Sequence, residues 1–193
     1  DGNHGRGVTT GLTDEAGVRA AFDLAVQHSA RVIVEEQLPG RDHRVLVVAG
    51  QVEAVAERIP AHVAGDGEHT VAELVERVNL DPRRGEGHEK MLTRIRLDQG
   101  ALDILAQQDL TPDSVPEAGR FVPLRGAANL STGGTAVDRT DDIHPDNAAI
   151  ARRAALTLGL DVAGVDLLAP DITRSIRDTG GGVVEVNAAP GLR

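Results

Sequence analysis

The chain has 193 residues, which is long enough for one large domain or two small ones with a hydrophobic core. Its formal net charge of -10 at pH 7 argues against a general basic face for nucleic acid or an anionic membrane. The absence of cysteine excludes disulfides, thiolate nucleophiles and zinc–thiolate sites. No apolar run approaches the roughly 20 residues of a membrane span. We therefore expect neither nucleic acid nor a membrane as a partner. Because the sequence lacks an initiating Met, we expect a fragment of a longer protein.

The first eight residues, DGNHGRGV, are rich in glycine. Glycine lets the backbone turn sharply and brings amide N–H groups close to a ligand without a Cβ in the way. His4 and Arg6 add side chains that can donate hydrogen bonds to phosphate oxygens. The spacing matches neither the dinucleotide fingerprint nor the P-loop. A phosphate-binding loop and a simple turn between strands are therefore equally good interpretations of these residues alone.

The N-terminal part of the chain predicts one helix and three strands. A helix is expected over residues 13–27, with Thr13 as its N-cap and an apolar stripe at helical spacing. The β-rich runs at residues 31–36 and 44–49 predict two strands. The second of these turns at a glycine into a further strand over residues 51–56, which gives a compact α/β start.

The middle of the chain is more polar and contains two expected helices. Thr70 and Glu73 form a capping-box pattern in front of a short amphipathic helix. A second helix is expected over residues 98–107. Between them, residues 81–88 (DPRRGEGH) form an irregular charged segment. This segment is either a solvated surface loop or an active-site loop, because long structureless insertions in compact domains are often functional.

The next region combines a short strand, a polar loop and a helix. A strand over residues 121–124 leads into the decapeptide at residues 125–134, which holds small and polar groups where a core would need apolar ones. Pro145 at the first helical position and Gly159 just past the end indicate the bounds of a helix.

Two strands near the C-terminus, VAGVDLL at residues 162–168 and VVEVN at residues 183–187, contain Asp166, Glu185 and Asn187. Alternate residues of a strand share a face, so pairing of the two strands would bring these three side chains together. Oxygen ligands without His or Cys select Mg²⁺ or Mn²⁺ over zinc. The alternative is a solvent-facing acidic surface. It suits Asp166 alone better than all three residues, because an unneeded carboxylate is costly to bury among apolar strands.

The order of these parts resembles the ATP-grasp superfamily over nearly the whole chain. The matching parts are the glycine-rich loop, VIVEEQLPGRDHR, GVDLL and VEVNAAPG. More narrowly, DGNHGRGV, RIPAHVAGDG with DPRRGEGH, LRGAANLSTGGTAVDRTDDIHP and VEVNAAPG are similar to the ATP-grasp module of the cyanophycin synthetase family. The last three of these motifs are long and specific.

The resemblance implies an α/β (α+β) chain with a partial ATP-grasp fold. That fold combines a small lid subdomain with a larger antiparallel-sheet subdomain and its helices. Residues 1–43 would form part of the lid and nucleotide-binding subdomain, and residues 44–193 the catalytic subdomain. Within the latter, a loop and helix at about residues 58–93 would be inserted.

The resemblance also implies a reaction. In that family the module uses ATP to add L-aspartate to the C-terminus of a cyanophycin polymer primer, and a separate module, absent here, adds arginine. The implied partners are ATP, L-aspartate and the primer, and the implied cofactor is Mg²⁺, with Mn²⁺ as an alternative. The parent protein would be a cytoplasmic homo-oligomer.

The resemblance assigns ATP to three groups of residues. The phosphates are assigned to the backbone of the opening loop and to the His4 side chain, adenine to a hinge, and the ribose hydroxyls to Asp42. The loop positions are Gly2, Asn3, His4, Gly5 and Gly7, and the hinge consists of Glu35, Glu36, Gln37 and Leu38.

The resemblance further makes Asp166, Glu185 and Asn187 the magnesium ligands. It assigns the substrate carboxylate and the transferring phosphoryl group to the following candidates: Arg44, Arg125, Asn129 and the loop at residues 131–134.

The sequence departs from the family pattern at two places. The lysine that relatives have on the strand before the opening loop is not in this sequence. Many peptide-forming relatives also have an arginine two residues before the first metal aspartate, where this chain has Gly164. Another cation must then meet the charge of the intermediate, and Arg44 and Arg125 are the candidates.

Three other interpretations stay open. The chain could belong to another peptide-forming ATP-grasp ligase, such as a glutathione-synthesising module. It could be a nucleotide-binding module without ligase activity, although all three metal positions are filled. The isolated piece could also be inactive by itself, because an ATP-grasp site lies between two subdomains.

Overall fold

The computed structural model describes residues 8–86 and 90–191, in two units that are considered separately: residues 1–38 and 39–193. In the first unit, α1 (Glu15–Ala25) has Asp14 as its N-cap, with the Asp14 carboxylate accepting a hydrogen bond from Gly17 N at 2.7 Å. The predicted helix is confirmed, but the predicted cap, Thr13, lies one residue too early.

The strand predicted over residues 31–36 is wrong. The segment has no regular secondary structure, and the side chains of Ile33 and Val34 are 78% and 72% exposed. A β-rich sequence needs a neighbouring strand for its ladder of hydrogen bonds. The described part of the first unit contains α1 and no strand that could pair with it.

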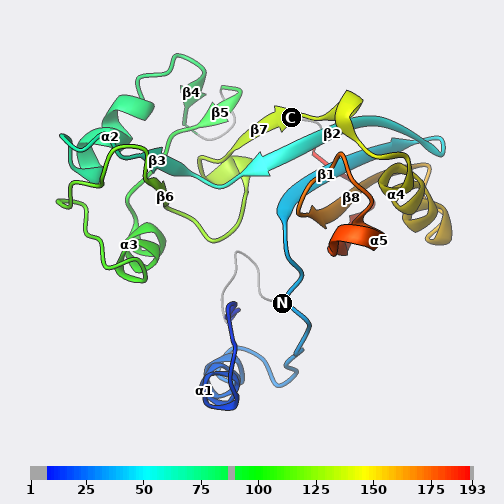
Figure 1. Ribbon diagram of the computed structural model, residues 1–193, viewed down its shortest axis with the longest axis horizontal. Coiled ribbons are helices and arrows are strands. Elements are labelled where there is room, and N and C mark those ends of the chain that lie inside the picture. Colours follow the sequence, from blue (N-terminus) through cyan, green and yellow to red (C-terminus); the bar gives the residue numbers. More distant parts are fainter. Residues whose placement is uncertain (1–7, 87–89, 192–193) are drawn as a thin grey trace. The chain divides into compact units, whose positions relative to one another are not determined.

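The second unit is built on a five-stranded sheet in the order β7-β2-β1-β8-β9 (Figure 1). Every neighbouring pair is antiparallel. The strands predicted around residues 44–56 and at the C-terminus are confirmed. The bounds are β1 (Arg41–Val48), β2 (Gln51–Ile59), β7 (Thr135–Asp138), β8 (Val162–Ala169) and β9 (Gly182–Asn187).

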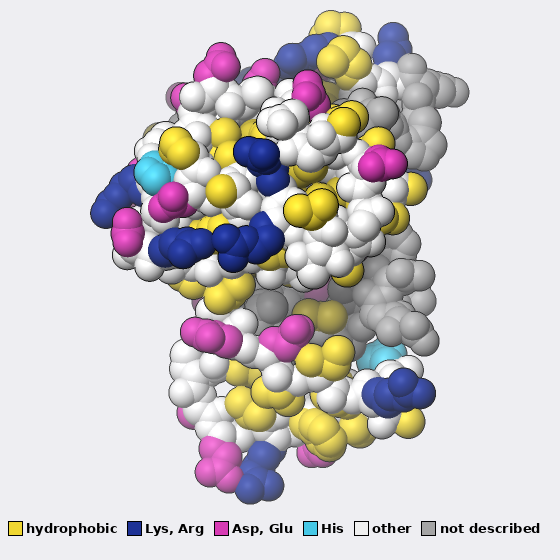
Figure 2. Space-filling view, turned by 90° about the vertical axis from the view of Figure 1, so that its right-hand side faces the viewer, with side chains coloured by type: hydrophobic (Ala, Val, Ile, Leu, Met, Phe, Trp, Pro, Cys, Tyr) yellow, Lys and Arg dark blue, Asp and Glu magenta, His cyan; other side chains and the backbone are white. Residues whose placement is uncertain are grey.

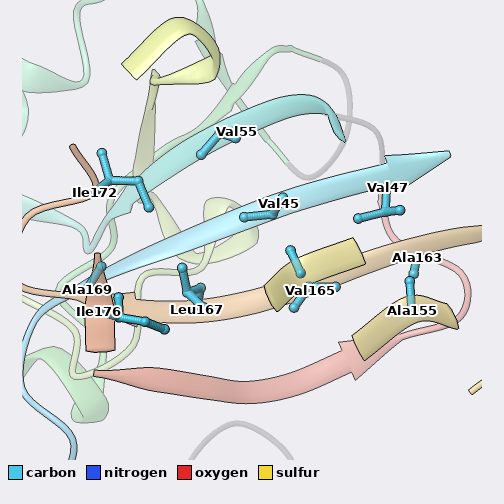
Figure 3. Packing of buried hydrophobic residues seen from close by; sticks show 11 residues of the cluster. Val45, Val47, Val55, Ala155, Ala163, Val165, Leu167, Ala169, Ile172 and Ile176 are labelled. Atoms are coloured by element: carbon cyan, nitrogen blue, oxygen red, sulfur yellow. The ribbon is translucent and has the colours of Figure 1, made fainter. Parts of the chain in front are cut away.

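One face of this sheet forms a hydrophobic core with α4 (Pro145–Thr157) and α5 (Ile176–Thr179). Strand alternation sends every second residue of β1 and β8 to this side, and Figure 3 shows the side chains that pack there. Pro145 begins α4 as predicted, and Gly159 follows it with a φ of 65°. The central members of the core are Val45, Val47, Val55, Val165 and Leu167.

A second apolar cluster lies under a group of shorter elements. Its helices are α2 (Val71–Val78), with the predicted capping box of Thr70 and Glu73, and α3 (Gln99–Ala106), capped by Asp98. The small strands pair as β3 (His62–Ala64) with β6 (Phe121–Pro123), and β4 (Arg84–Gly85) with β5 (Leu92–Thr93). Two 3-10 turns, η2 (Leu130–Thr132) and η3 (Thr140–Asp142), complete the unit. The two helices and the strand predicted for this region are confirmed.

Candidate functional site

The face of the sheet opposite the α4 core is polar. The register pairs Arg44 with Asp166, and Asp166 with Glu185, across β1, β8 and β9. A register irregularity between Asp166 and Leu167 gives β9 one extra residue there. Such bulges commonly re-aim side chains beside functional sites. The expected pairing of the strands that carry Asp166, Glu185 and Asn187 is thereby confirmed, and the metal role of these residues stays a prediction.

The Asp166 carboxylate accepts hydrogen bonds from two arginines. Arg44 Nε lies 2.7 Å from Oδ1 and Arg44 Nη2 lies 2.7 Å from Oδ2, while Arg58 Nη2 lies 2.9 Å from Oδ2. The hydrogen bond with Asp166 raises the pKa of Arg44 above its ordinary value, and the charges of Asp42 and Glu185 add to this effect. The pair is bidentate and largely shielded from water, which is the strong form of such an interaction.

Gly164 explains how Arg44 reaches this position. A Cβ added at Gly164 would lie 3.3 Å from Arg44 Cδ and 2.6 Å from Pro190 Cβ. The Arg44 side chain therefore crosses directly over the glycine. The resemblance described above places an arginine of the relatives at the position of Gly164 on β8. In this chain the side chain of Arg44, from β1, lies over that position.

Asn187 connects Glu185 to the ion pair of Arg44 and Asp166. Its side-chain amide fits its neighbours best with nitrogen toward Glu185 Oε1, 2.8 Å away, and oxygen 3.3 Å from Arg44 Nη2. At this sheet face, two carboxylates and one amide oxygen therefore lie on adjacent strands with an arginine between them.

A pocket of about 380 Å³ opens over this face. One side consists of residues from β1 and β2, and the other of the loop before β7. The Asn129 carboxamide oxygen accepts hydrogen bonds from Ser131 N at 3.0 Å and from Ser131 Oγ at 2.8 Å, which fixes this part of the loop. The lining includes Arg44, Arg58, Asn129, Ser131, Ala136 and Pro190.

A larger depression of about 650 Å³ lies beside α2. None of the residues predicted from the sequence to act on ATP, metal or substrate lines it. The smaller pocket is the candidate site, because its walls include the predicted residues Arg44, Asn129 and Ser131. Arg44 also binds Asp166, one of the predicted metal ligands.

Arg125 is not brought to the pocket. Its guanidinium pairs with Asp98, the N-cap of α3, at Nη1–Oδ1 2.8 Å and Nη2–Oδ2 2.7 Å. The cation that sequence reasoning missed is Arg58, which binds Asp166 and lines the pocket. Counting back from the turn after β1 would have placed Arg58 opposite Arg41. The register shift between Leu46 and Val47 places it opposite Asp42 instead, and no signal in the sequence marked that shift.

The residues predicted from the resemblance to bind ATP fall into three groups. Gly2, Asn3, His4, Gly5 and Gly7 lie outside the described residues. Glu35, Glu36 and Gln37 are exposed and Leu38 is half-buried in the first unit, where Gln37 Oε1 accepts a hydrogen bond from Gly11 N. Asp42, in the second unit, accepts hydrogen bonds from Arg58 Nε at 3.1 Å and from Nη2 at 2.6 Å. All these assignments stay predictions.

The donor set fits a hard divalent cation. Within the described residues, no group of three or more His, Cys, Asp or Glu side chains is arranged to hold a metal. Asp166, Glu185 and Asn187 offer two carboxylates and one amide oxygen, and magnesium sites commonly combine one or two carboxylates with substrate phosphates. Zinc prefers nitrogen and sulfur ligands, which this group does not offer.

One face of the molecule outside the pocket is mixed in charge. Figure 2 shows one face of the molecule, on which basic side chains have acidic and apolar neighbours. No helix in the described ranges combines the length and the apolar character that a membrane span requires.

Comparison with a solved structure defines the class of protein. The crystal structure of a bifunctional glutathione synthetase from Pasteurella multocida matches 98% of this chain with a TM-score of 0.69 and 36% sequence identity, and the match covers 26% of that protein. The glutathione biosynthesis bifunctional protein of Mannheimia succiniciproducens is 38% identical over 193 residues. The chain therefore has the ATP-grasp fold, and these relatives are ligases.

Comparison with curated sequences is more specific. Cyanophycin synthetases of Nostoc sp. and Synechocystis sp. are 54% and 51% identical to this chain over its whole length. The chain spans only 21% and 22% of those two proteins. No family model matches the chain. The chain is thus a homologue of one segment of the cyanophycin synthetases, about a fifth of their length.

Proposed function

We propose that this chain is the ATP-dependent ligase module of a cyanophycin synthetase. ATP transfers its γ-phosphoryl group to the C-terminal carboxylate of the polymer, which gives an acyl phosphate and ADP. The amine of L-aspartate then attacks the acyl carbon, forms the amide and releases phosphate. The observation that supports this proposal best is the whole-chain identity of 54% to such a synthetase, combined with a polar sheet face below a pocket. Cytoplasmic location and a homo-oligomeric parent protein belong to the same proposal.

Asp166, Glu185 and Asn187 are proposed to hold Mg²⁺ or, alternatively, Mn²⁺. When bound, this ion neutralises negative charge on the phosphate oxygens of ATP. Both oxygens of Asp166 contact guanidinium groups in the present arrangement. Arg58 keeps Asp42 as a second carboxylate partner, so Asp166 can take another cation without leaving Arg58 unpaired.

Arg44 is proposed to stabilise the moving phosphoryl group and the substrate carboxylate. It lies at the centre of the polar face and lines the pocket. Fixed cationic donors in a site with little water stabilise developing negative charge strongly. Asn129 and Ser131 on the opposite side of the pocket are proposed to contact substrate. His4, with the glycine-rich loop, is proposed to bind the ATP phosphates, the hinge at residues 35–38 to bind adenine, and Asp42 to bind the ribose.

Arg125 was predicted as a second substrate arginine. Its bidentate pair with Asp98 favours a different role: Arg125 connects the loop before β7 to the N-terminus of α3. We therefore propose Arg44 in preference to Arg125 as the cation that meets the intermediate.

The test is ATP hydrolysis and polymer growth by the complete enzyme with Mg²⁺ and cyanophycin primer. Aspartate, arginine, both together and a β-aspartyl-arginine dipeptide are compared. Turnover that requires aspartate supports the proposal. Growth on the dipeptide alone indicates a dipeptide-using ligase, and no turnover with any of the four contradicts the proposal.

The metal assignment is tested separately by Glu185→Gln. This change keeps the shape of the side chain and removes one anionic ligand, so aspartate-dependent ATP turnover should fall at least about 100-fold. Glu53→Gln, which changes an exposed glutamate on β2, is the matched control and should keep the wild-type rate. Equal rates in the two variants would remove Glu185 from the proposed ligands.

A second candidate is a glutathione-synthetase-like ligase, because such proteins are 36% to 41% identical to this chain. Both candidates need the same polar face and differ in the acceptor carboxylate and the amine. A cysteine-containing dipeptide with glycine, offered in the same ATP assay, distinguishes them. Turnover with that pair and none with primer and aspartate would select the second candidate.

A further inference from the structure

Two neighbouring arginines in the segment at residues 81–88 have different surroundings. Arg83 is 65% exposed, and its Nη2 pairs with Asp81 Oδ2 at 2.7 Å, only two residues away in the sequence. Arg84 is half-buried at the start of β4. The first arginine therefore belongs to a local surface turn, whereas the second contacts the interior of the fold.

Arg84 uses one nitrogen to join two separate parts of the chain. Its Nη1 donates to Thr93 O at 2.6 Å and to Gly133 O at 3.0 Å, and Gly133 lies 49 residues further along the sequence. Burial lowers the pKa of Arg84 below its ordinary value, yet an arginine stays charged at neutral pH. Among the described residues, this shielded cation donates to backbone carbonyls and forms no ion pair within 4.0 Å.

Gly133 lies near the end of the loop before β7, which forms one side of the pocket. It terminates η2 with a φ of 97°, a backbone conformation that favours glycine. A Cβ at this position would lie 2.9 Å from Ile95 Cγ1. Ile95 is itself fixed by Asn79, whose side chain exchanges two hydrogen bonds with the Ile95 backbone at 2.8 and 2.9 Å. The end of η2 thus packs against a buried residue whose backbone is held by two hydrogen bonds.

The other end of the same turn faces the pocket. Asn129 and Ser131 both line it, and the Asn129 backbone oxygen accepts a hydrogen bond from Gly134 N at 3.1 Å. The turn from Asn129 to Gly134 is closed on itself by this bond. A contact that holds Gly133 therefore also determines where Asn129 and Ser131 lie.

We propose that Arg84 is a positioning residue for the substrate pocket: by holding the Gly133 carbonyl, it fixes the turn that presents Asn129 and Ser131 to the substrate. The inference rests on the proposed function of the pocket and adds a role for the segment at residues 81–88. Arg84 does not line the pocket, so it acts through the turn and does not touch the substrate.

The kinetic test compares Arg84→Ala with Arg83→Ala in the complete enzyme, supplied with Mg²⁺, ATP, primer and aspartate. Arg84→Ala should raise KM for primer or aspartate about 10-fold and leave KM for ATP within about twofold. Arg84→Lys should recover part of the loss, because its ammonium can still donate to one carbonyl. Arg83→Ala is the matched control and should behave as wild type. Equal kinetics of the two alanine variants, or an effect confined to ATP, would overturn the proposal.

Hydrogen exchange gives a second readout that does not need activity. Amides of residues 130–134 should exchange faster in Arg84→Ala than in wild type or Arg83→Ala. Unchanged exchange there would overturn the positioning role even if activity fell. If wild-type enzyme uses no ATP with primer and aspartate, the proposed function fails, while the exchange comparison still decides whether Arg84 holds the turn. Should Arg84→Ala not fold, Arg84→Met, which keeps an unbranched side chain and removes its donors, is measured in its place, and wild-type exchange in that variant together with wild-type KM would contradict the proposal.

Discussion

The two faces of the five-stranded sheet are made by the same strands and differ in chemistry. On β1, Val45 and Val47 point into the α4 core, while Arg44, directly before Val45, points to the opposite side. On β8, Leu167 is fully buried in the core, and the adjacent Asp166 binds two arginines on the other face. Core residues and residues of the proposed site are therefore adjacent in sequence and separated by the thickness of the sheet.

This arrangement gives the polar face a rigid support. Buried apolar side chains stabilise the sheet by roughly 25 cal/mol for each Å² removed from water. Buried ion pairs add little net stability, because the desolvation of both charges offsets their attraction. We therefore expect substitutions on the core face to change stability and substitutions on the polar face to change activity.

The largest effect is expected from Leu167→Ala on the core face. Leu167 is 0% exposed, and its truncation should lower the free energy of unfolding by about 2–5 kcal/mol, because the lost transfer energy adds to the cost of a cavity. Denaturant unfolding measures this loss. At a temperature where the variant stays folded, its ATP turnover should equal that of wild type. A large loss of turnover in folded protein would show that the two faces are coupled.

Arg44→Lys, on the polar face, should lower ATP turnover and leave the stability of the fold nearly unchanged. Lysine keeps the charge but cannot make the bidentate contact with Asp166, so turnover should fall about 10- to 100-fold, equivalent to about 1.4–2.7 kcal/mol. The free energy of unfolding should change by less than about 1 kcal/mol.

Arg153→Lys on the exposed side of α4 is the matched control for Arg44→Lys and should alter neither quantity. A mainly structural loss in Arg44→Lys would contradict the separation of roles. Unchanged turnover would remove Arg44 from the site.

Much of the sheet could be predicted from the sequence, because its signals are local. Alternation and β-branched residues mark β1 and β8, and Pro145 and Gly159 mark the ends of α4. Residues 31–36 have the same type of local signal and form no strand in the described part of the first unit. Pairing partners decide strand formation, and a sequence pattern does not state whether a partner is present.

The candidate site could be predicted only in part. Asp166 and Glu185 are found because an acidic residue in an apolar strand is unusual. The choice between Arg44 and Arg125 depended on register: β1 lies next to β8, so Arg44 pairs with Asp166, whereas Arg125 meets Asp98. Arg58 and Arg84 were missed because their partners, Asp166 and Gly133, lie 108 and 49 residues away in the sequence.

His43 and its cross-strand partner Glu57 are buried polar residues on the core face of the sheet, and His43 tests how apolar that face must be. Its side chain is buried there, with ring Nδ1 2.9 Å from Arg41 O. Burial lowers the pKa of His43 below its ordinary value of 6.5, although the Arg41 carbonyl and the charges of Glu57 and Asp42 favour the protonated ring and Arg139 opposes it. The unfolded chain then binds a proton at higher pH than the folded chain. The His43 contribution to stability is therefore complete above pH 6.5 and falls as the pH drops through the folded pKa, with a slope of at most about 1.4 kcal/mol per pH unit.

Denaturant unfolding at a series of pH values between 7.5 and about 5 measures this slope, and His43→Gln should flatten it. Parallel curves for the variant and the wild type would show that His43 keeps its ordinary pKa despite its place among the valines of β1.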